Sequence, residues 1–170
     1  DKGRLLFGWV QAGAAVRRSG RIVVVEGYTD VLACHGAGLH EAVAALGTAF
    51  TAEHARLCAR LAKRSLVLLD GDEAGQRASF KVVEKLLQAK LKVQIACLPP
   101  GEDPDSLVRR RGPDALNDVI TGARSAIEYF IDFIFSDGSM SVEDRVEGAR
   151  RVAVLLDALS LGLEKDLYTA

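Results

Sequence analysis

The stretch LVLLDGDEAG at residues 66–75 is the starting point for interpreting the chain. Its four consecutive apolar residues predict a strand that is buried on both faces. The apolar run stops at Asp70, and a helical pattern follows from Glu73. In an extended segment the carboxylates of Asp70 and Asp72 point to the same side, because side chains alternate along a strand. Gly71 between them has no β-carbon, so a ligand can approach the backbone there.

Paired carboxylates at the end of a buried strand lie where open α/β sheets bind ligands. Two like charges so close together are costly unless a cation joins them. We therefore expect Asp70 and Asp72 to form half of a divalent-metal site. The structural alternative is that Asp70 and Gly71 form an ordinary turn and that Asp72 caps the helix from Glu73.

Three further apolar runs resemble the first, and helical patterns separate them. The expected strands span residues 22–25, 42–46, 66–69 and 93–98. The expected helices span residues 9–18, 28–35 and 73–89, with another opened by Thr51. This alternation predicts an α/β fold: a parallel four-stranded sheet with helices on both faces. A strand order of 2-1-3-4 would place the ends of the first and third strands side by side.

After Arg111 the pattern becomes helical, at residues 115–120, 126–135 and 142–161. We expect three parts: a lead-in from a preceding subdomain at residues 1–20, a catalytic core at 21–111 and an all-helical subdomain at 112–170. The chain begins with Asp1 and ends inside a helical pattern, so we expect a segment of a longer protein.

Composition narrows the class of protein. The chain has 22 Lys and Arg against 23 Asp and Glu, so total charge argues neither for nor against nucleic acid. No apolar run reaches the roughly 18 residues of a membrane span, and no secretory leader is visible. The three cysteines are far apart in sequence, and we expect them to be small buried residues of a cytoplasmic protein.

Acidic residues follow each strong strand. Glu26 ends the first strand, with Asp30 about one helical turn later. Because the ends of parallel strands share one edge, we expect a common cleft lined by Glu26, Asp70, Asp72, Asp103 and Asp105. Such hard oxygen ligands suit one or more Mg²⁺ or Mn²⁺ ions, which can activate an attacking hydroxyl and stabilise a leaving pyrophosphate.

Each acid also has a structural explanation to be weighed. Asp103 could cap a helix with Pro104 at its first position, and Asp105 would then lie in the first turn. Glu26 is harder to explain in this way, because a carboxylate directly after four buried residues needs a partner. The basic residues also have two possible roles: they could form a solvated surface, or they could bind nucleic-acid phosphates. These residues are Lys2, Arg4, Lys63, Arg77 and Lys81.

Four segments resemble the TOPRIM domain of bacterial DnaG-type primases. They are EGYTD at residues 26–30, ALGTA at 45–49, DGDEAG at 70–75 and PGEDPDSLV at 100–108. The first and third patterns are shared by all TOPRIM proteins, including topoisomerases and repair nucleases. The other two are more specific to primases, and the KGR opening at residues 2–4 also resembles the primase sequence that leads into this domain.

The resemblance implies a metal-dependent RNA polymerase that makes short primers on single-stranded DNA from ribonucleoside triphosphates. It implies that Glu26, Asp70 and Asp72 are catalytic and that Asp103 and Asp105 complete the metal ligands. Asp30, Gly27 and Gly71 would support them. It also implies a helicase and a single-strand-binding protein as partners of regions outside this segment.

The family's zinc-binding module and the basic N-terminal half of its polymerase domain do not match any part of this chain. We therefore expect weak or no priming by the 170 residues alone. Two alternatives stay open at this point: a strand-cleaving TOPRIM enzyme of the nuclease or topoisomerase type, and a non-catalytic replisome scaffold.

Overall fold

The computed structural model describes residues 2–70, 73–135 and 141–159. The strands are β1 Leu6–Phe7, β2 Arg21–Val25, β3 Ala42–Ala45, β4 Arg64–Leu69, β5 Lys92–Cys97 and β6 Arg124–Ser125. A 3₁₀ turn, η1, spans Lys2–Arg4. The helices are α1 Trp9–Ser19, α2 Tyr28–Gly36, α3 Ala52–Leu61, α4 Glu73–Gln88, α5 Pro104–Arg111, α6 Pro113–Thr121, α7 Ala126–Phe135 and α8 Val142–Ala158. Within these residues, no helix has the length and apolar character needed to cross a membrane.

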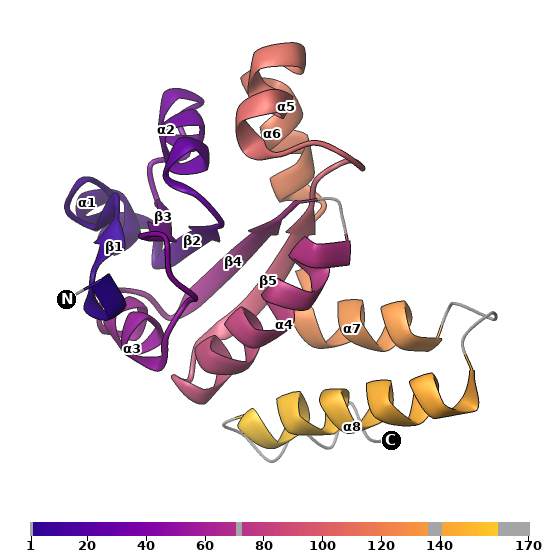
Figure 1. Cartoon of the computed structure of the whole chain (residues 1–170). Coiled ribbons are helices and arrows are strands. Elements are labelled where there is room, and N and C mark those ends of the chain that lie inside the picture. The colour runs from indigo at the N-terminus through magenta and orange to yellow at the C-terminus, as the bar shows by residue number, and fades with distance from the viewer. Residues whose placement is uncertain (1, 71–72, 136–140, 160–170) are drawn as a thin grey trace.

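The strands form one sheet in the order β1-β3-β2-β4-β5-β6 (Figure 1). The four inner strands are parallel, and their order confirms the 2-1-3-4 arrangement predicted for the four apolar runs. The parallel pairing of β2 with β4 brings the strand before Glu26 beside the strand before Asp70. The topology therefore fixes which acids can meet.

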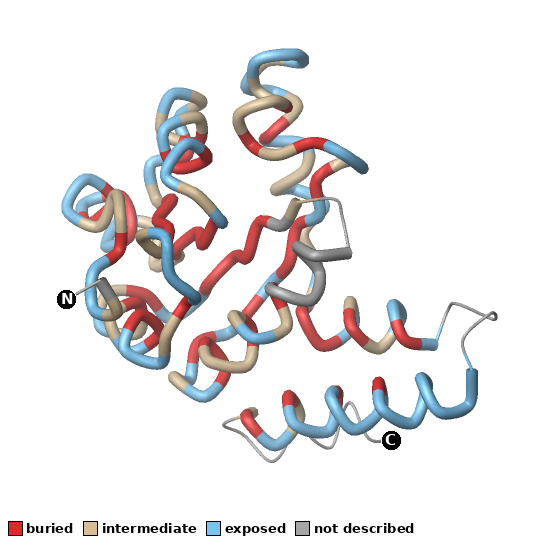
Figure 2. Tube along the Cα trace, viewed as in Figure 1, coloured by how far each residue is buried: buried red, intermediate tan, exposed pale blue. Residues whose placement is uncertain are grey.

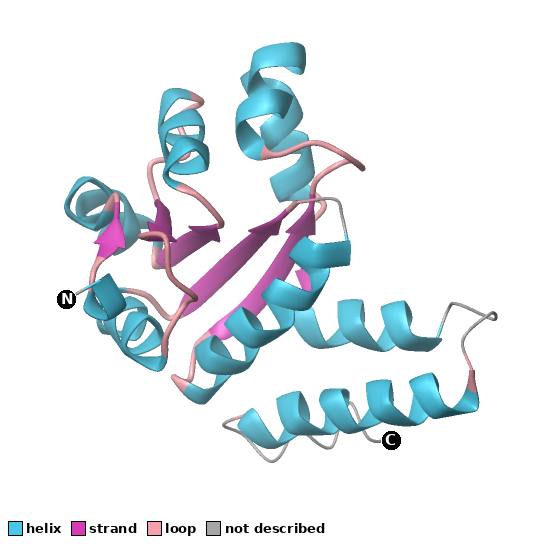
Figure 3. Ribbon diagram, viewed as in Figure 1, coloured by secondary structure: helices cyan, strands magenta, loops and turns pink. Residues whose placement is uncertain are grey.

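Helices cover both faces of the sheet (Figure 3). One face packs Ile22, Val24 and Val67 against helices α1, α3, α4, α7 and α8. The other face packs the alternate strand residues, such as Val23 and Leu66, against α2, α5 and α6. Figure 2 shows the resulting line of buried residues along β2, β4 and β5. Because both faces of the sheet are buried, charged side chains are expected at the ends of its strands.

The predicted four-stranded sheet was too small, because two edge strands complete it. Both β1 and β6 pair antiparallel with their neighbours and are two residues long. The expectation for the cysteines was also wrong at one position: Cys34 and Cys58 are buried, whereas Cys97 is exposed.

The helices after residue 112 continue the same packing. Ile127 and Phe130 of α7 and Leu155 of α8 share a hydrophobic core with α4. Ser141 caps α8 by accepting a hydrogen bond from the backbone N–H of Asp144 (3.0 Å). The boundary between residues 111 and 112 stays a prediction.

Gly8 is expected to be essential for stability. It has φ +78°, and a β-carbon there would lie 2.8 Å from Val31 Cγ1 and 2.9 Å from the Ala42 carbonyl oxygen. Gly8→Ala combines a left-handed backbone with overpacking, so we expect it to lower the free energy of unfolding by about 2–4 kcal/mol in urea titrations.

Gly36→Ala is the matched control. Gly36 lies in helix α2, and a β-carbon there would meet nothing within 4 Å. Its effect should be smaller than about 1 kcal/mol and favourable, because alanine is the better helix former. Equal effects of the two substitutions would contradict the packing at Gly8.

Candidate active site at the carboxyl edge of the sheet

Glu26 occupies the first position after β2. Val25 before it is buried, and Glu26 itself is exposed. The chain turns into α2 because the Gly27 N–H donates to Asp30 Oδ2 (2.7 Å). Asp30 is only 5% exposed, and a β-carbon on Gly27 would lie 3.2 Å from that same oxygen. Gly27 and Asp30 thus act as a local brace that fixes where Glu26 leaves the sheet.

Asp70 lies at the end of β4, next to Glu26. The two side chains are joined by a hydrogen bond. Burial, the charge and hydrogen bond of Glu26, and the charges of Asp30 and Asp103 together raise the pKa of Asp70 to about 7. Asp70 is therefore partly protonated near neutral pH, which relieves the repulsion from the neighbouring acids.

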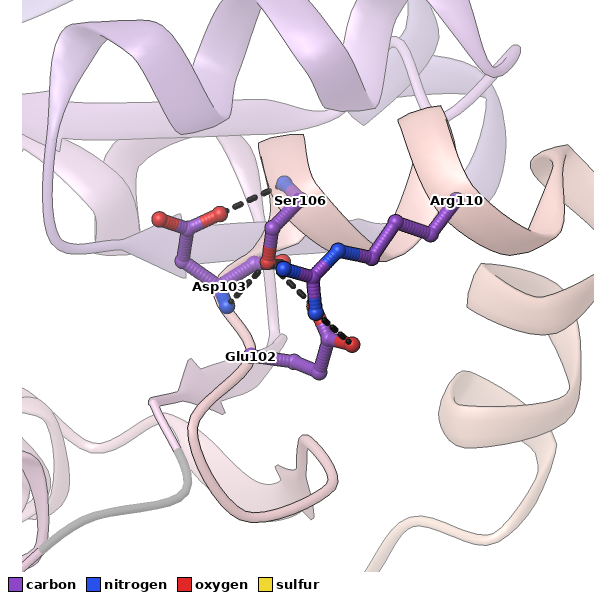
Figure 4. Close-up of polar contacts among 4 residues, drawn as sticks. All are labelled: Glu102, Asp103, Ser106 and Arg110. Carbon is purple, nitrogen blue, oxygen red and sulfur yellow. Dashed lines mark hydrogen bonds and ion pairs between the residues drawn. The ribbon is translucent and has the colours of Figure 1, made fainter.

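The third part of the cluster comes from the loop between β5 and α5. Asp103 caps α5, since its Oδ1 accepts from the Ser106 N–H (2.6 Å) (Figure 4). Asp105 lies in the first turn of α5, with its Oδ2 3.6 Å from Arg109 Nη1. The capping role that was one alternative for Asp103 is thus real, and it leaves the second carboxylate oxygen turned away from the helix (Figure 4).

The causes of the pKa shift of Asp30 indicate that these acids lie near one another. Burial raises the pKa of Asp30, the Gly27 N–H opposes this, and the charges of Asp103, Glu26 and Asp105 add to the increase. Helices α2 and α5 also pack against each other (Figure 1). The structure therefore brings Glu26, Asp30, Asp70, Asp103 and Asp105 to one edge of the sheet.

The donor set fits a hard divalent cation, because every group is a carboxylate. Among the described residues, however, no three acidic, histidine or cysteine side chains are close enough together to hold a metal ion. Asp72 and Gly71, both predicted site residues, lie outside the described residues. The ligand roles stay a prediction.

Glu102 is a residue of this edge that the sequence analysis did not single out. It is 6% exposed, and its carboxylate accepts hydrogen bonds from Ser106 Oγ and from Arg110 Nη1 (3.1 Å). These bonds, with the Arg110 charge, lower the pKa of Glu102. Its spacing from Ser106 and Arg110, four and eight residues, is the only sequence signal that could have indicated it.

The basic residues do not all lie beside the acids. Lys63 precedes β4, and its N–H bonds to the Gly20 carbonyl at the amino edge of the sheet, opposite Glu26. The phosphate-binding role predicted for Lys63 stays a prediction, and it would act at the edge of the sheet opposite the acids. Arg4 is exposed just before β1, whose antiparallel pairing with β3 puts that end near the carboxyl edge. Lys81 is exposed on α4.

The backbones of Lys2, in η1, and of Arg77, in α4, are described, whereas their side chains are not. The phosphate-binding role assigned to these two residues stays a prediction.

A family model described as Toprim-like matches residues 23–108, half of the chain, and the match includes every acid of the cluster. The chain belongs to the Toprim-like family. This confirms the resemblance inferred from the sequence motifs. A DNA primase of Halalkalibacterium halodurans is 33% identical to this Toprim-like chain over 170 residues. The match covers 99% of the chain and 28% of that primase, so the chain spans about a quarter of the length of this curated relative.

Solved structures agree with the fold. The Aquifex aeolicus primase, solved with its zinc-binding and RNA polymerase domains, is 31% identical, with a TM-score of 0.83 over 98% of this chain and 40% of that one. The DnaG primase catalytic domain bound to ssDNA is 29% identical, with a TM-score of 0.81 over 98% of this chain and 55% of that one. The Toprim-like chain therefore has the architecture of primase catalytic cores.

Asp70→Asn is expected to stabilise the metal-free chain at high pH. The folded state keeps a proton on Asp70 up to a pKa of about 7, whereas the unfolded carboxyl releases it near 3.8. Stability therefore falls as pH rises through this window, and the loss is complete above it. Because Asp70 is half-buried, we expect a gain of about 1–2 kcal/mol near pH 8 and almost none near pH 4.

Urea unfolding in a chelating buffer at both pH values measures this difference. Asp118→Asn, at an exposed position of α6, controls for the loss of one carboxylate elsewhere. Identical stability changes at both pH values for Asp70→Asn would contradict the crowded pair.

Proposed function

We propose that this chain is the catalytic core of a DNA primase, which joins ribonucleotides into short primers on a single-stranded DNA template. The observation that carries the proposal is the hydrogen-bonded pair of Glu26 and Asp70 within a cluster of further carboxylates. Such a cluster suits metal-dependent nucleotidyl transfer. Relatives named DNA primase, and a related catalytic domain solved with ssDNA, support the choice of substrates.

We assign the metal ligands to Glu26, Asp70, Asp72, Asp103 and Asp105. Bound Mg²⁺ or Mn²⁺, more than one ion in our proposal, would activate the primer 3′-hydroxyl and neutralise the leaving pyrophosphate. The proton on Asp70 would leave when the cation binds, because a ligating carboxylate must be ionised. Glu26, the exposed member of the pair, is our candidate to accept the hydroxyl proton.

The remaining residues position these groups. Asp30 and Gly27 would hold the turn after β2, so that the Glu26 carboxylate does not have to be ordered at the moment of reaction. We assign phosphate contacts to Lys2, Arg4, Arg77 and Lys81, and also to Lys63, which lies at the other edge of the sheet.

The partners of the whole protein are part of the same proposal. We expect single-stranded DNA, ribonucleoside triphosphates and the RNA primer at this site. We expect zinc, the replicative helicase and the single-strand-binding protein to bind other regions of a cytoplasmic replication protein.

Strand cleavage is the competing activity within the family. A topoisomerase needs a nucleophilic tyrosine. Among the described residues, Tyr129 is half-buried and hydrogen-bonded to Cys97, whereas Tyr28 is 59% exposed. Incubating the full-length protein with labelled single-stranded DNA, ribonucleotides and Mg²⁺ separates the two activities. Synthesis of RNA products would support the proposal. Shortened DNA without any RNA product would contradict it and indicate strand cleavage instead.

Glu26→Gln in the full-length protein should lower the rate of primer synthesis by about 100-fold or more, because it removes a charged ligand and the proposed base. DNA binding, measured by fluorescence anisotropy, should change by no more than about twofold, since phosphate contacts dominate that affinity.

Glu41→Gln is the matched control for this experiment. Glu41 directly precedes β3, so it has the same charge at the opposite edge of the sheet. Its side chain is 14% exposed and pairs with Arg21 (4.0 Å). We expect primer synthesis to stay within about twofold of wild type, because the substitution removes this ion pair and leaves the carboxyl edge unchanged. A Glu26→Gln protein that primes at the wild-type rate would rule out the proposed role of this carboxylate.

A further inference from the structure

Glu102 is buried beside the metal-binding candidates, yet its own carboxylate is fully engaged. It is 6% exposed and accepts from Ser106 Oγ through Oε2 and from Arg110 Nη1 through Oε1 (Figure 4). Both donors belong to α5, one and two turns along from Glu102. Each carboxylate oxygen therefore already has a protein donor, so the negative charge of Glu102 is compensated without a cation.

Ser106 connects Glu102 to Asp103. Its N–H donates to Asp103 Oδ1 (2.6 Å), and its hydroxyl oxygen accepts from the Asp103 N–H (3.0 Å). A hydroxyl has one proton, so when that proton points at Glu102 the lone pairs face the Asp103 N–H. Glu102 therefore sets the orientation of the hydroxyl that accepts from the Asp103 N–H, one of the two hydrogen bonds that join Asp103 to Ser106.

The backbone before Glu102 adds a second constraint. Gly101 has φ +74°, a left-handed conformation, and the Glu102 N–H donates to the Pro99 carbonyl (3.0 Å). This turn directs the Glu102 side chain inward at the point where the chain leaves β5 for α5. Without the inward anchor, the loop between Pro99 and Asp103 would be held by the turn alone.

The orientation of Asp103 is the result of both constraints. Its carboxylate is turned to the opposite side of Ser106 from the pair of Glu102 and Arg110 (Figure 4). Its charge reaches Asp30 and Asp70 on the neighbouring elements. The direction in which the Asp103 carboxylate points is thus set by groups that do not themselves face the acidic cluster.

We propose that Glu102 is a positioning residue, which acts through Ser106 and is anchored by Arg110 to hold Asp103 in the orientation that binds the divalent cation. This inference rests on the proposed function, because it assumes that the acidic cluster binds a metal. Groups that orient metal ligands typically change metal affinity by about 10- to 100-fold when they are removed.

Titration of the 170-residue chain with Mn²⁺, followed by the EPR signal of the free ion, tests the proposal without any need for primer synthesis. We expect Glu102→Gln and Ser106→Ala to weaken Mn²⁺ binding about tenfold or more. Ser106→Thr keeps both the hydroxyl and the N–H, so it should restore affinity to within about threefold of wild type. A merely structural role for Ser106 would not produce this split between two folded variants.

Arg110→Ala and Arg111→Ala form a second matched pair. Arg110 is 67% exposed at its side chain, so its removal should leave the fold intact, and it bonds Glu102, whereas Arg111 influences Glu102 only through its charge. We expect weaker Mn²⁺ binding for Arg110→Ala and little change for Arg111→Ala. This pair decides the question even if Glu102→Gln does not fold, which melting of the far-UV circular dichroism signal would reveal.

Asp70→Asn separates this inference from the proposed function. If wild type and Asp70→Asn bind Mn²⁺ equally, the acidic cluster is not a metal site, and the function and the inference both fall. If Asp70→Asn abolishes binding while the Glu102, Ser106 and Arg110 variants bind like wild type, only the inference is overturned. In the full-length protein, excess Mg²⁺ should restore primer synthesis to Ser106→Ala but not to Asp70→Asn.

Discussion

The crowding of Glu26 and Asp70 at the end of two buried strands is the constraint on which the site depends. The apolar residues of β2 and β4 are held between two layers of helices, so the strand ends cannot separate without opening the core. Burial and the neighbouring charge of Glu26 then raise the pKa of Asp70. The hydrophobic core thus supplies the free energy that keeps like charges together, and a cation is the partner that would relieve them.

Much of the fold could be predicted from the sequence because burial on both faces leaves a clear signal. Runs such as Ile22–Val25 are apolar without interruption, and the order of the four parallel strands followed from connecting them in the usual way. The edge strands Leu6–Phe7 and Arg124–Ser125 left no comparable signal, because two residues show no periodicity. Their pairing depends on the neighbouring strand rather than on their own composition.

The candidate site was predictable to the extent that topology determines it. Glu26, Asp70 and Asp103 each follow a parallel strand, and the ends of such strands meet at one edge. Lys63 precedes a strand instead of following one, so it lies at the other edge of the sheet, away from these acids. Glu102 was missed because its burial depends on Arg110 reaching back across two helical turns, a contact that spacing alone does not specify.

Glu102 and Asp70 show how environment separates two carboxylates of the same edge. Hydrogen bonds from Ser106 and Arg110 satisfy Glu102 and lower its pKa, so this charge is stable within the protein alone. Burial and the charges of Glu26, Asp30 and Asp103 instead raise the pKa of Asp70. A group that the protein compensates holds the structure, whereas a group that it leaves uncompensated requires a ligand. The uncompensated acids are the ones that follow the buried strands, where the core leaves them no alternative arrangement.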